Sequence, residues 1–358
     1  MFGKRAERRS IDLQAWARGE INLTDGGSND PMRLATVIGC VGLRSALVSQ
    51  MPINCLQSVN GVRVEVANSL IDQPSLRVVR SVWLQQMMIS RDLMGNAIGA
   101  ITSRDRLGRA TTVDWLNPSK VTFDESVAGR LGVKVNGQDV DPSDLVIVPD
   151  WTPPGSVVGV SRLAKSGMVE LALKAQQFAS DWFENGATPS AFITSDQHLT
   201  SEQARQVRDS VTASWKRRRP AVLGAGLKVE LAKINGDETQ MLQTITAMDS
   251  AICRVFGIPS EMQGIAASGQ SVTYANRDQR LTDLLVTGLN ADLVVIQETL
   301  TAHVPRGQAV RFNTGALLRS DLSTRYASYA IGLTHGFLTI DEVREMEDRP
   351  PLPQGAPV

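Results

Sequence analysis

The sequence predicts an α+β fold, in which long helices alternate with short strands. Apolar residues recur at helical spacing over residues 31–51, 162–185 and 237–256. Between the first two of these stretches, strand-like runs over 53–149 are divided by turn signals such as Asn60-Gly61. A chain of 358 residues is long enough for about two domains, at roughly 150 residues each.

In the first half, a weakly ordered arm over residues 1–30 is expected to precede a helix over 31–51 that is closed by Pro52. The apolar spacing predicts a buried side made of Leu34, Val37, Ile38, Val41, Leu43 and Leu47. The elements predicted next are a hairpin over 53–66, a helix over 81–93 that ends at Gly95-Asn96, and strands over 97–103 and 110–116.

The second half is organised around two long helices, predicted over 162–185 and 237–256. The second helix carries a narrow stripe of apolar residues at an average spacing of about 3.5 residues. Such a stripe needs another helix to pack against. This stripe consists of Met241, Ile245, Met248, Ile252 and Val255. We expect the two helices to pack antiparallel, because the segment between them folds back as a small insert.

The insert is predicted to hold a strand over 190–194, a helix opened by the capping box Thr200-Ser201-Glu202-Gln203, and a strand pair over 221–223 and 228–232. After the second long helix, the small uncharged residues 263–271 predict a loop. The remaining elements expected are a long helix over 272–301, a strand over 309–312, two short helices of which the second starts with the capping box at Thr339, and a non-helical tail at 350–353.

Charge and composition exclude several classes of protein. The chain has 37 Lys and Arg against 37 Asp and Glu, so its formal net charge is zero. A protein that wraps nucleic acid by electrostatic attraction needs an excess of basic residues, so this class is excluded. A protein that lets DNA slide past without holding it is not excluded. With 42% hydrophobic and 21% charged residues, the chain is no disordered tail, collagen-like repeat or disulfide scaffold.

The lengths of the apolar runs and the number of cysteines indicate in which compartment the protein folds. No apolar run approaches the ~18 residues of a membrane span, and the charged start at 1–9 lacks the apolar stretch of a signal peptide. We therefore expect no membrane partner and folding in a cytoplasm. Cys40, Cys55 and Cys253 are expected to be buried free thiols.

Motifs of catalysis and cofactor binding are absent from the sequence. It contains no Walker-type phosphate loop, no H-E-x-x-H, no G-x-S-x-G and no Cys/His cluster at zinc spacing. Gly224-Ala225-Gly226 lacks the third glycine of a dinucleotide turn. His198, His303 and His335 are expected to be exposed or capping side chains, and the mixed charges over 342–349 a solvated face. The expectation is no enzyme, no cofactor and no metal.

One basic cluster stands out, formed by Lys216, Arg217, Arg218 and Arg219. Four adjacent cations can neutralise phosphates, dock an acidic protein partner, or simply form a solvated loop after a helix. Aromatic residues are not interleaved with the cluster, so sequence-specific reading of single strands is not expected. The three interpretations stay open at the level of sequence.

The order of short motifs over residues 31–352 resembles the portal proteins of tailed bacteriophages with long non-contractile tails. Arg162 stands where the family usually has proline. The motifs, in chain order, are Val37-Ile38-Gly39-Cys40-Val41 with Ser49-Gln50-Met51-Pro52, Asp92-Leu93-Met94-Gly95-Asn96-Ala97, Leu116-Asn117-Pro118-Ser119-Lys120-Val121, Gly159-Val160-Ser161-Arg162-Leu163, Phe183-Glu184-Asn185-Gly186-Ala187-Thr188-Pro189, Phe256-Gly257-Ile258-Pro259, Phe312-Asn313-Thr314 to Arg319-Ser320-Asp321, and Gly336-Phe337-Leu338-Thr339 to Glu342-Val343-Arg344.

This resemblance implies a phage portal fold with named parts. They are an N-terminal arm (1–30), an α/β wing (31–160), antiparallel stem helices (161–188 and 236–257), a small α/β clip insert (189–235), a tunnel loop (258–272), a long wing helix and strand (273–312), a helical crown (313–349) and a Pro-rich tail (350–358). The tunnel loop would touch DNA through Gly264, Ile265, Ala266, Ala267, Ser268, Gly269 and Gln270.

The implied function is a dodecameric ring at the unique capsid vertex, serving as the channel for DNA packaging and ejection. The implied partners are further copies of the chain, double-stranded DNA bound without sequence specificity, a terminase packaging ATPase, a head–tail adaptor and the major capsid protein. The alternatives are a non-channel adaptor or capsid ring protein and, further off, a phage nucleic-acid-processing enzyme.

Overall fold

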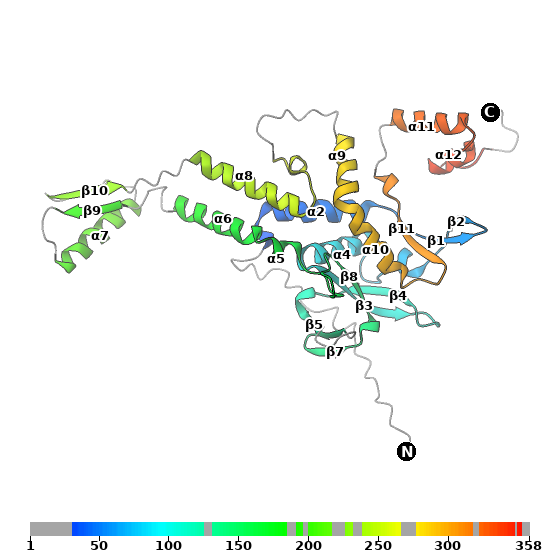
Figure 1. The fold of residues 1–358 in the computed structure, drawn as a ribbon, viewed down its shortest axis with the longest axis horizontal. Helices are drawn as coiled ribbons and strands as arrows, with labels where there is room; N and C mark the ends of the chain where they lie inside the picture. Colours follow the sequence, from blue (N-terminus) through cyan, green and yellow to red (C-terminus); the bar gives the residue numbers. More distant parts are fainter. Residues whose placement is uncertain are drawn as a thin grey trace, which may run out of the picture. The chain divides into compact units, whose positions relative to one another are not determined.

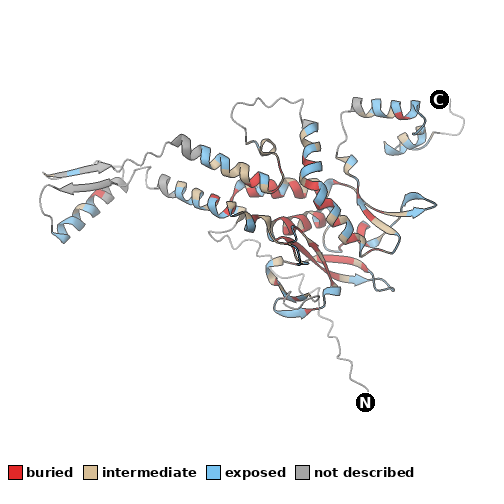
Figure 2. Cartoon of the chain, in the orientation of Figure 1, coloured by how far each residue is buried: buried red, intermediate tan, exposed pale blue. Residues whose placement is uncertain are grey.

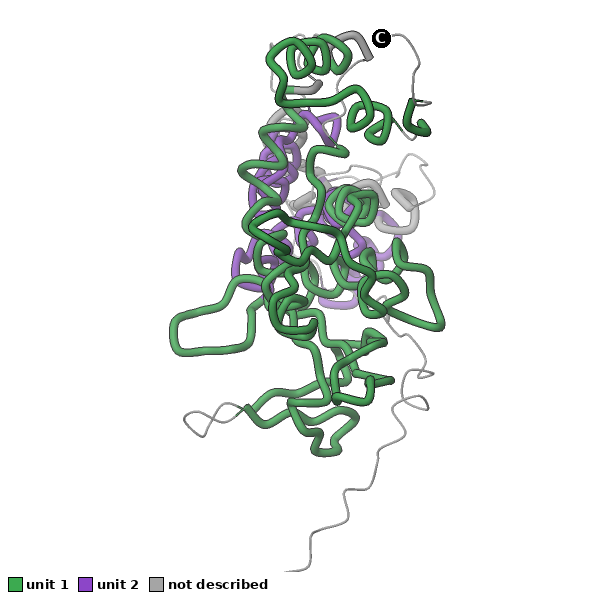
Figure 3. The backbone as a smooth tube through the Cα atoms, turned by 90° about the vertical axis from the view of Figure 1, so that its right-hand side faces the viewer, with its two compact units in different colours: residues 1–20, 42–160, 270–358 green, residues 21–41, 161–269 purple. Residues whose placement is uncertain are grey.

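The chain divides into two compact units (Figure 3). Unit 1 comprises residues 1–20, 42–160 and 270–358, and unit 2 comprises residues 21–41 and 161–269. The structure, a computed structural model, describes residues 31–124, 131–184, 191–195, 200–216, 226–231, 238–265, 277–317, 322–347 and 349–352.

The first helix forms where it was predicted, but its start and one of its predicted buried residues differ. Residues 31–33 form a separate 3-10 turn (η1, Pro31–Arg33), and the helix itself is α2 (Ala35–Gln50). Most of the predicted apolar side is buried or half-buried, but Ile38 is 49% exposed, so its assignment to that side is wrong. Ile38 shares the exposed side of the helix with Ala35 and Gly42.

Antiparallel sheets of three strands form the β part of unit 1; the sequence predicted strands here but not how they assemble into sheets. The β1–β2 hairpin turns at Asn60 and Gly61, whose φ angles of 53° and 84° suit the predicted tight turn. The strand orders are β11-β1-β2, β4-β3-β8 and β5-β6-β7, with bounds β1 (Ile53–Val59), β2 (Val62–Glu65), β3 (Asn96–Arg104), β4 (Ala110–Trp115), β5 (Val121–Asp124), β6 (Gly132–Val135), β7 (Gln138–Val140), β8 (Leu145–Pro149) and β11 (Gln308–Phe312).

Pairing of β1 with β11 joins segments that are far apart in the chain. Ile53 lies opposite Phe312 in this antiparallel pair. The sequence predicted both strands but not their partnership, because apolar alternation shows which face is buried and not which strand lies alongside. The C-terminal part of unit 1 therefore completes a sheet that begins near residue 53.

Helices of unit 1 cover the sheets and supply much of its core. Trp83 on α4 packs against Trp115 on β4, with ring centroids 4.7 Å apart, and its indole N–H donates to the Val113 carbonyl at 2.7 Å. Figure 2 shows the buried residues gathered in α4, α10, β3 and β8. The other helical elements are α3 (Ser69–Asp72), α4 (Arg80–Met94), η2 (Pro118–Lys120), η3 (Pro142–Asp144), α10 (Asn290–Thr301) and η7 (Thr314–Ala316).

A buried network of charges joins these helices. The Arg44 guanidinium on α2 donates to Asp92 on α4 at 2.8 Å and to Asp292 on α10. Arg91 on α4 also reaches Asp292, at 2.9 Å, and Asp150 after β8, at 3.2 Å. None of these side chains is more than 6% exposed. Burial alone would lower the pKa of Arg44, but Asp92 and Asp292 outweigh it and raise that pKa.

The long helix predicted over 272–301 is interrupted. Its described part starts with α9 (Arg277–Asp283), widens into the π-helical turn η6 (Leu284–Leu289), and continues as α10. Arg44 donates to the Gly288 carbonyl at 2.8 Å, so a residue of α2 binds a backbone group of the widened turn. Residues 272–276 of the predicted helix lie outside the described residues.

Unit 2 holds the two long helices, which run side by side in opposite directions (Figure 1). The helix predicted over 162–185 is divided at Gly167, whose φ of 65° ends the short α5 before α6 begins. The elements of unit 2 beyond η1 and α2 are α5 (Arg162–Ser166), α6 (Met168–Glu184), β9 (Ala191–Ser195), α7 (Ser201–Lys216), β10 (Leu227–Leu231), α8 (Glu238–Val255) and η4 (Ser260–Gln263).

The strand pairing that the structure describes in the insert was not predicted. β10 pairs antiparallel with β9, with Val229 opposite Ile193. The strand predicted over 221–223 lies outside the described residues, so its pairing with 228–232 stays a prediction. The predicted capping box is confirmed, because Thr200 accepts from the N–H of Gln203 at 3.4 Å and Gln203 accepts from the N–H of Thr200 at 3.0 Å.

Two helices near the C-terminus, α11 (Leu322–Thr334) and α12 (Ile340–Met346), confirm the two predicted there, including the capping box at Thr339. The solvated face expected over 342–349 is only partly correct. Glu347 forms an ion pair with Arg325 at 2.9 Å and accepts from the Tyr329 hydroxyl at 3.1 Å. Its carboxylate therefore ties the segment after α12 to α11.

Replacing Arg44 by Met tests the buried network. The change leaves Asp92 and Asp292 buried beside only one remaining cation, Arg91, so the free energy of unfolding should fall by about 3–5 kcal/mol. Urea unfolding measures the loss. The matched control is Arg63→Met on the exposed strand β2, which should leave the unfolding curve unchanged, and equal curves for the two variants would contradict the network's role.

Candidate functional site

The apolar stripe of α8 is the part of the predicted site that the structure describes best. Ile252 is buried, whereas Ile245, Met248 and Val255 are half-buried; the side chain of Met241 lies outside the described part. Because α8 contacts both α5 and α6, its stripe lies on a helix already packed within one copy of the chain. The role of the stripe in packing between copies stays a prediction.

Within unit 2, α8 is also fixed to the first residues of α2. The Thr36 hydroxyl donates to Asp249 at 2.5 Å, and the Cys40 thiol donates to the Cys253 sulfur at 3.7 Å. This hydrogen bond lowers the pKa of Cys253 against the opposing effect of burial. Both sulfurs belong to free buried thiols, as does that of Cys55, which confirms the sequence prediction for the cysteines.

Two large apolar side chains of α6 stay exposed, beside the exposed ion pair of Glu170 and Lys174. Leu171 and Phe178, seven residues apart, are 48% and 57% exposed, whereas Val169 and Ala172 are buried. Residues seven apart lie on nearly the same side of an α-helix, after about two turns. A single copy of the chain therefore leaves apolar surface on α6 in contact with water, a cost that a second protein surface would remove.

The start of the predicted tunnel loop is well defined. η4 ends at Gly264, whose φ of 74° lies in the left-handed region that glycine adopts without strain. The N–H of Ile265 donates to the Ser260 carbonyl at 3.1 Å. A Cβ at Gly39 would lie 2.3 Å from the amide oxygen of Gln263, so Gly39 leaves the space that this flexible side chain of η4 fills. The loop residues Ala266, Ala267, Ser268, Gly269 and Gln270 lie outside the described residues.

The basic cluster begins where α7 ends. Lys216 is the last residue of the helix, and Arg217, Arg218 and Arg219 lie outside the described residues. Of the α7 side chains that the structure describes, Val211 is buried and nearly all the others are exposed. The insert thus presents a mostly polar helix, and the three interpretations of the cluster stay open.

Two of the motifs that carried the resemblance meet in unit 1. The Asn96 amide donates to the Gly159 carbonyl at 2.6 Å and its oxygen accepts the Gly159 N–H at 2.8 Å. A Cβ on Gly159 would lie 2.3 Å from the Gly95 carbonyl oxygen and 2.6 Å from the Asp150 nitrogen. Those are backbone atoms and cannot move aside, so the site requires glycine. Gly95 itself, with φ 80°, caps α4.

Arg162, the departure from the motif, has a structural explanation. It is the first residue of α5, and the hydroxyl of the N-cap Ser161 accepts the N–H of Ala164 at 3.4 Å. Proline is favoured at this first helical position because its fixed φ suits a helix start and its missing N–H is not needed there. Arginine satisfies the same position without altering the cap.

Over the part of the chain that the structure describes, no cluster of three or more His, Cys, Asp or Glu side chains could hold a metal ion. No helix in these residues is both long enough and apolar enough to cross a bilayer.

Comparison with known sequences decides the family. The sequence profile of the family described as "Phage portal protein" matches residues 35–348 of the chain. The chain belongs to the phage portal protein family. This confirms the resemblance over nearly the whole chain. The family is a structural component of the phage particle, at the capsid vertex, which also confirms that the chain is no enzyme.

Curated relatives come from two phages. The "Probable portal protein" of Streptomyces phage phiC31 is 27% identical over 359 residues, covering 91% of this chain and 77% of the relative. The "Portal protein" of Enterobacteria phage HK97 is 25% identical over 357 residues, covering 93% and 83%. Both alignments span the two units of the chain.

Solved structures confirm the portal fold. The crystal structure of an HK97 family phage portal protein from Corynebacterium diphtheriae matches with a TM-score of 0.65 at 17% identity, covering 85% of this chain and 99% of that one. A chain from the neck of an empty gene transfer agent particle, a reconstruction computed with C6 symmetry, matches at 0.59 and 16%, covering 96% and 99%. One from the neck of the native particle, computed with C12 symmetry, matches at 0.55 and 16%, covering 88% and 91%.

Sequence patterns missed one group of residues that the fold brings together. His303 was expected to be exposed or to cap a helix, but it is half-buried, and it lines a pocket with Arg104, Arg109 and Arg306. The expectation for His303 is therefore wrong. These residues come from two distant segments, so no spacing rule shows them together. His335 is exposed as expected, and His198 lies outside the described residues.

The contact between Asn96 and Gly159 can be tested by replacing Asn96 with Ala. The change leaves a buried N–H and a buried carbonyl of Gly159 without partners, so the free energy of unfolding should fall by about 2–4 kcal/mol. Urea unfolding gives the value. Asn54→Ala is the matched control, because Asn54 bonds Glu65 in an exposed position; it should cost less than about 1 kcal/mol. Similar losses in both variants would contradict the assignment.

Proposed function

We propose that the chain assembles into a closed ring of twelve identical subunits, through whose bore double-stranded DNA passes during packaging and ejection. Membership of the portal family supports a ring in the phage particle. The exposed apolar side chains Leu171 and Phe178 on α6 are the observation that supports the ring at the level of residues. In this ring, that surface would be covered by a neighbouring subunit.

Ring closure requires two different surfaces on each subunit that fit one another. A head-to-tail interface of this kind generates a ring when its rotation closes. The antiparallel pair of α6 and α8 offers one surface on each helix, and the partly exposed residues of the α8 stripe, Ile245 and Met248, provide apolar area for the second. Each subunit would thus present α6 to one neighbour and α8 to the other.

The number twelve is supported by the symmetry of similar particles. One of the matching chains comes from a gene transfer agent neck computed with C12 symmetry, and another from a neck computed with C6 symmetry. A twelve-fold ring also has six-fold symmetry, so both fit a ring of twelve.

The lack of excess positive charge in the chain suits a channel through which DNA passes without being bound tightly. The formal net charge of the chain is zero, and residues 264–270 carry no charged side chain. Each phosphate contact strengthens binding and has to be released again when DNA moves, so a neutral loop opposes transit less than a basic groove. We assign the tunnel loop to residues 258–272, with 264–270 touching the DNA.

Partners are assigned to the other segments. The clip insert, residues 189–235, is proposed to dock the terminase packaging ATPase and the head–tail adaptor, with Lys216 to Arg219 as the candidate contact. The ATPase would supply the energy of packaging, because the portal family itself is structural. The wing over 31–160 would face the major capsid protein, and the crown over 313–349 the inside of the capsid.

The variant Leu171→Ser/Phe178→Ser tests the proposed ring surface. Both side chains are already exposed, so the subunit should stay folded, whereas loss of the apolar surface should convert rings into smaller species. Light scattering after size-exclusion chromatography measures the mass. Leu76→Ser/Val79→Ser, at two exposed apolar positions of unit 1, is the control and should leave the rings intact. Rings of unchanged mass in the α6 variant would contradict this surface.

Deleting residues 266–269 tests the tunnel loop. Rings should still assemble, but phage carrying the deletion should package or retain less DNA, because the loop no longer reaches the bore. DNA content per particle is the measurement. A control of equal length, in which 266–269 are replaced by glycine and serine, keeps an uncharged loop and should package normally. Normal DNA content in the deletion would refute the assignment.

A further inference from the structure

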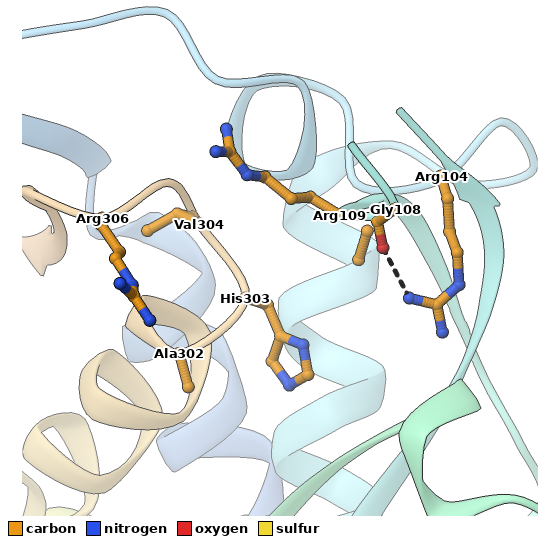
Figure 4. A pocket seen from close by; sticks show the side chains of 8 residues that line it. Arg104, Gly108, Arg109, Ala302, His303, Val304 and Arg306 are labelled. Carbon is orange, nitrogen blue, oxygen red and sulfur yellow. Dashed lines mark hydrogen bonds between the residues drawn. The ribbon is translucent and has the colours of Figure 1, made fainter. Parts of the chain in front are cut away.

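A cationic pocket in unit 1 is not used in the function proposed above. Its volume is about 420 Å³, and its walls come from the β3–β4 turn and from the loop between α10 and β11. Figure 4 shows Arg104 on one side and His303 and Arg306 on the other. Arg109 also lines it, and no carboxylate is among the lining residues.

The arginines of the pocket differ in how their charges are balanced. Arg104 is fixed, because it donates to the carbonyls of Gly108 at 2.9 Å and Ser143 at 2.6 Å and to the carboxylate of Asp144 at 2.9 Å. Neither Arg109 nor Arg306 has an ion pair or a side-chain hydrogen bond with any described residue. Two guanidinium groups therefore remain available at one pocket.

His303 adds a third group that can respond to an anion. Burial and the neighbouring Arg104 lower the pKa of His303, so its ring is neutral near pH 7. The charged groups that line the pocket with it are Arg104 from β3, Arg109 from the β3–β4 turn and Arg306 from its own loop; Asp144 acts through Arg104. An anion beside this ring would favour its protonated form.

We propose that this pocket binds the carboxylates of an acidic protein segment, with Arg109 and Arg306 as the groups that bind them. A guanidinium forms paired hydrogen bonds with a carboxylate, which gives both attraction and a fixed geometry. The site is independent of the proposed channel, since it needs neither the ring nor DNA.

Surroundings of the pocket favour a protein segment over nucleic acid. Leu107, at the tip of the β3–β4 turn, is 73% exposed and offers an apolar contact that a peptide side chain can use. Asp105 lies in the same turn, where its carboxylate accepts the N–H groups of Leu107 at 2.8 Å and Arg109 at 2.9 Å. Asp105 and Asp144 would repel a continuous row of phosphates more than one acidic side chain, because the repulsion grows with the number of negative charges.

The test measures binding of a short fluorescein-labelled peptide of glutamate and leucine to the full-length protein by fluorescence anisotropy. Arg109→Ala/Arg306→Ala should weaken binding at least about tenfold, because two charge-assisted interactions are lost. The matched control is Arg63→Ala/Arg80→Ala, which removes the same charge from two exposed positions outside the pocket and should change binding by less than about twofold. Equal unfolding curves show that both variants fold.

Each contrary result has a distinct meaning. Equal weakening in the two double variants would show that the peptide responds only to overall charge, and would overturn the proposal. Failure of the unaltered protein to bind the peptide would overturn it as well. If a short DNA duplex displaces the peptide and loses affinity in the pocket variant more than the peptide does, the site is one for nucleic acid and the proposal is wrong.

The pH dependence of peptide binding tests His303 separately from the arginines, because removing an arginine charge would not abolish it. Carboxylate binding should strengthen as the pH falls from about 8 to about 6, because His303 takes up a proton in the complex while glutamate stays ionised. His303→Gln should remove this dependence and leave binding near pH 8 almost unchanged. An unaltered pH dependence in that variant would exclude His303 from the site.

Discussion

The buried charges around Arg44 are the interaction on which the arrangement of unit 1 depends. Arg44 and Arg91 bind three carboxylates that come from α4, from the end of β8 and from α10. Charges buried this deeply are costly unless every partner is in place, so the network rejects arrangements in which any one of these elements is displaced. It also reaches the backbone of the π-helical turn through Gly288, and thereby fixes a widened helix that would otherwise be unfavourable. The network thus specifies one packing of helices and sheet.

Much of the fold could be predicted from local signals, and the unpredicted part is the part that depends on distant contacts. The β1–β2 hairpin, both capping boxes and the two long helices follow from residues close together in the chain. Arg44 gave a signal that was not used, since it is the single charge in an otherwise apolar helix and such a charge needs a buried partner. The pairing of β1 with β11, and the meeting of His303 with Arg104, had no local signal. The α8 stripe, the basic cluster and the uncharged loop were found from the residues themselves, whereas their roles came from the resemblance and stay predictions.

Family motifs acquire a physical meaning in this fold. Gly95, Asn96 and Gly159 are distant in sequence, yet they form one junction in which an amide side chain replaces a strand partner and a glycine permits backbone contact. Motif residues of this kind maintain the fold, whereas the surfaces proposed for function lie elsewhere: the exposed side of α6, the uncharged loop and the pocket beside the β3–β4 turn. In the proposed assembly, this framework carries surfaces that other molecules complete.

Electron microscopy of the purified chain tests the central claim most directly, because it shows assembly and bore together. Class averages of end-on views should show closed rings of twelve subunits around an opening wide enough for a DNA duplex, about 20 Å across. Single compact particles, or closed assemblies without an opening of that width, would contradict the account.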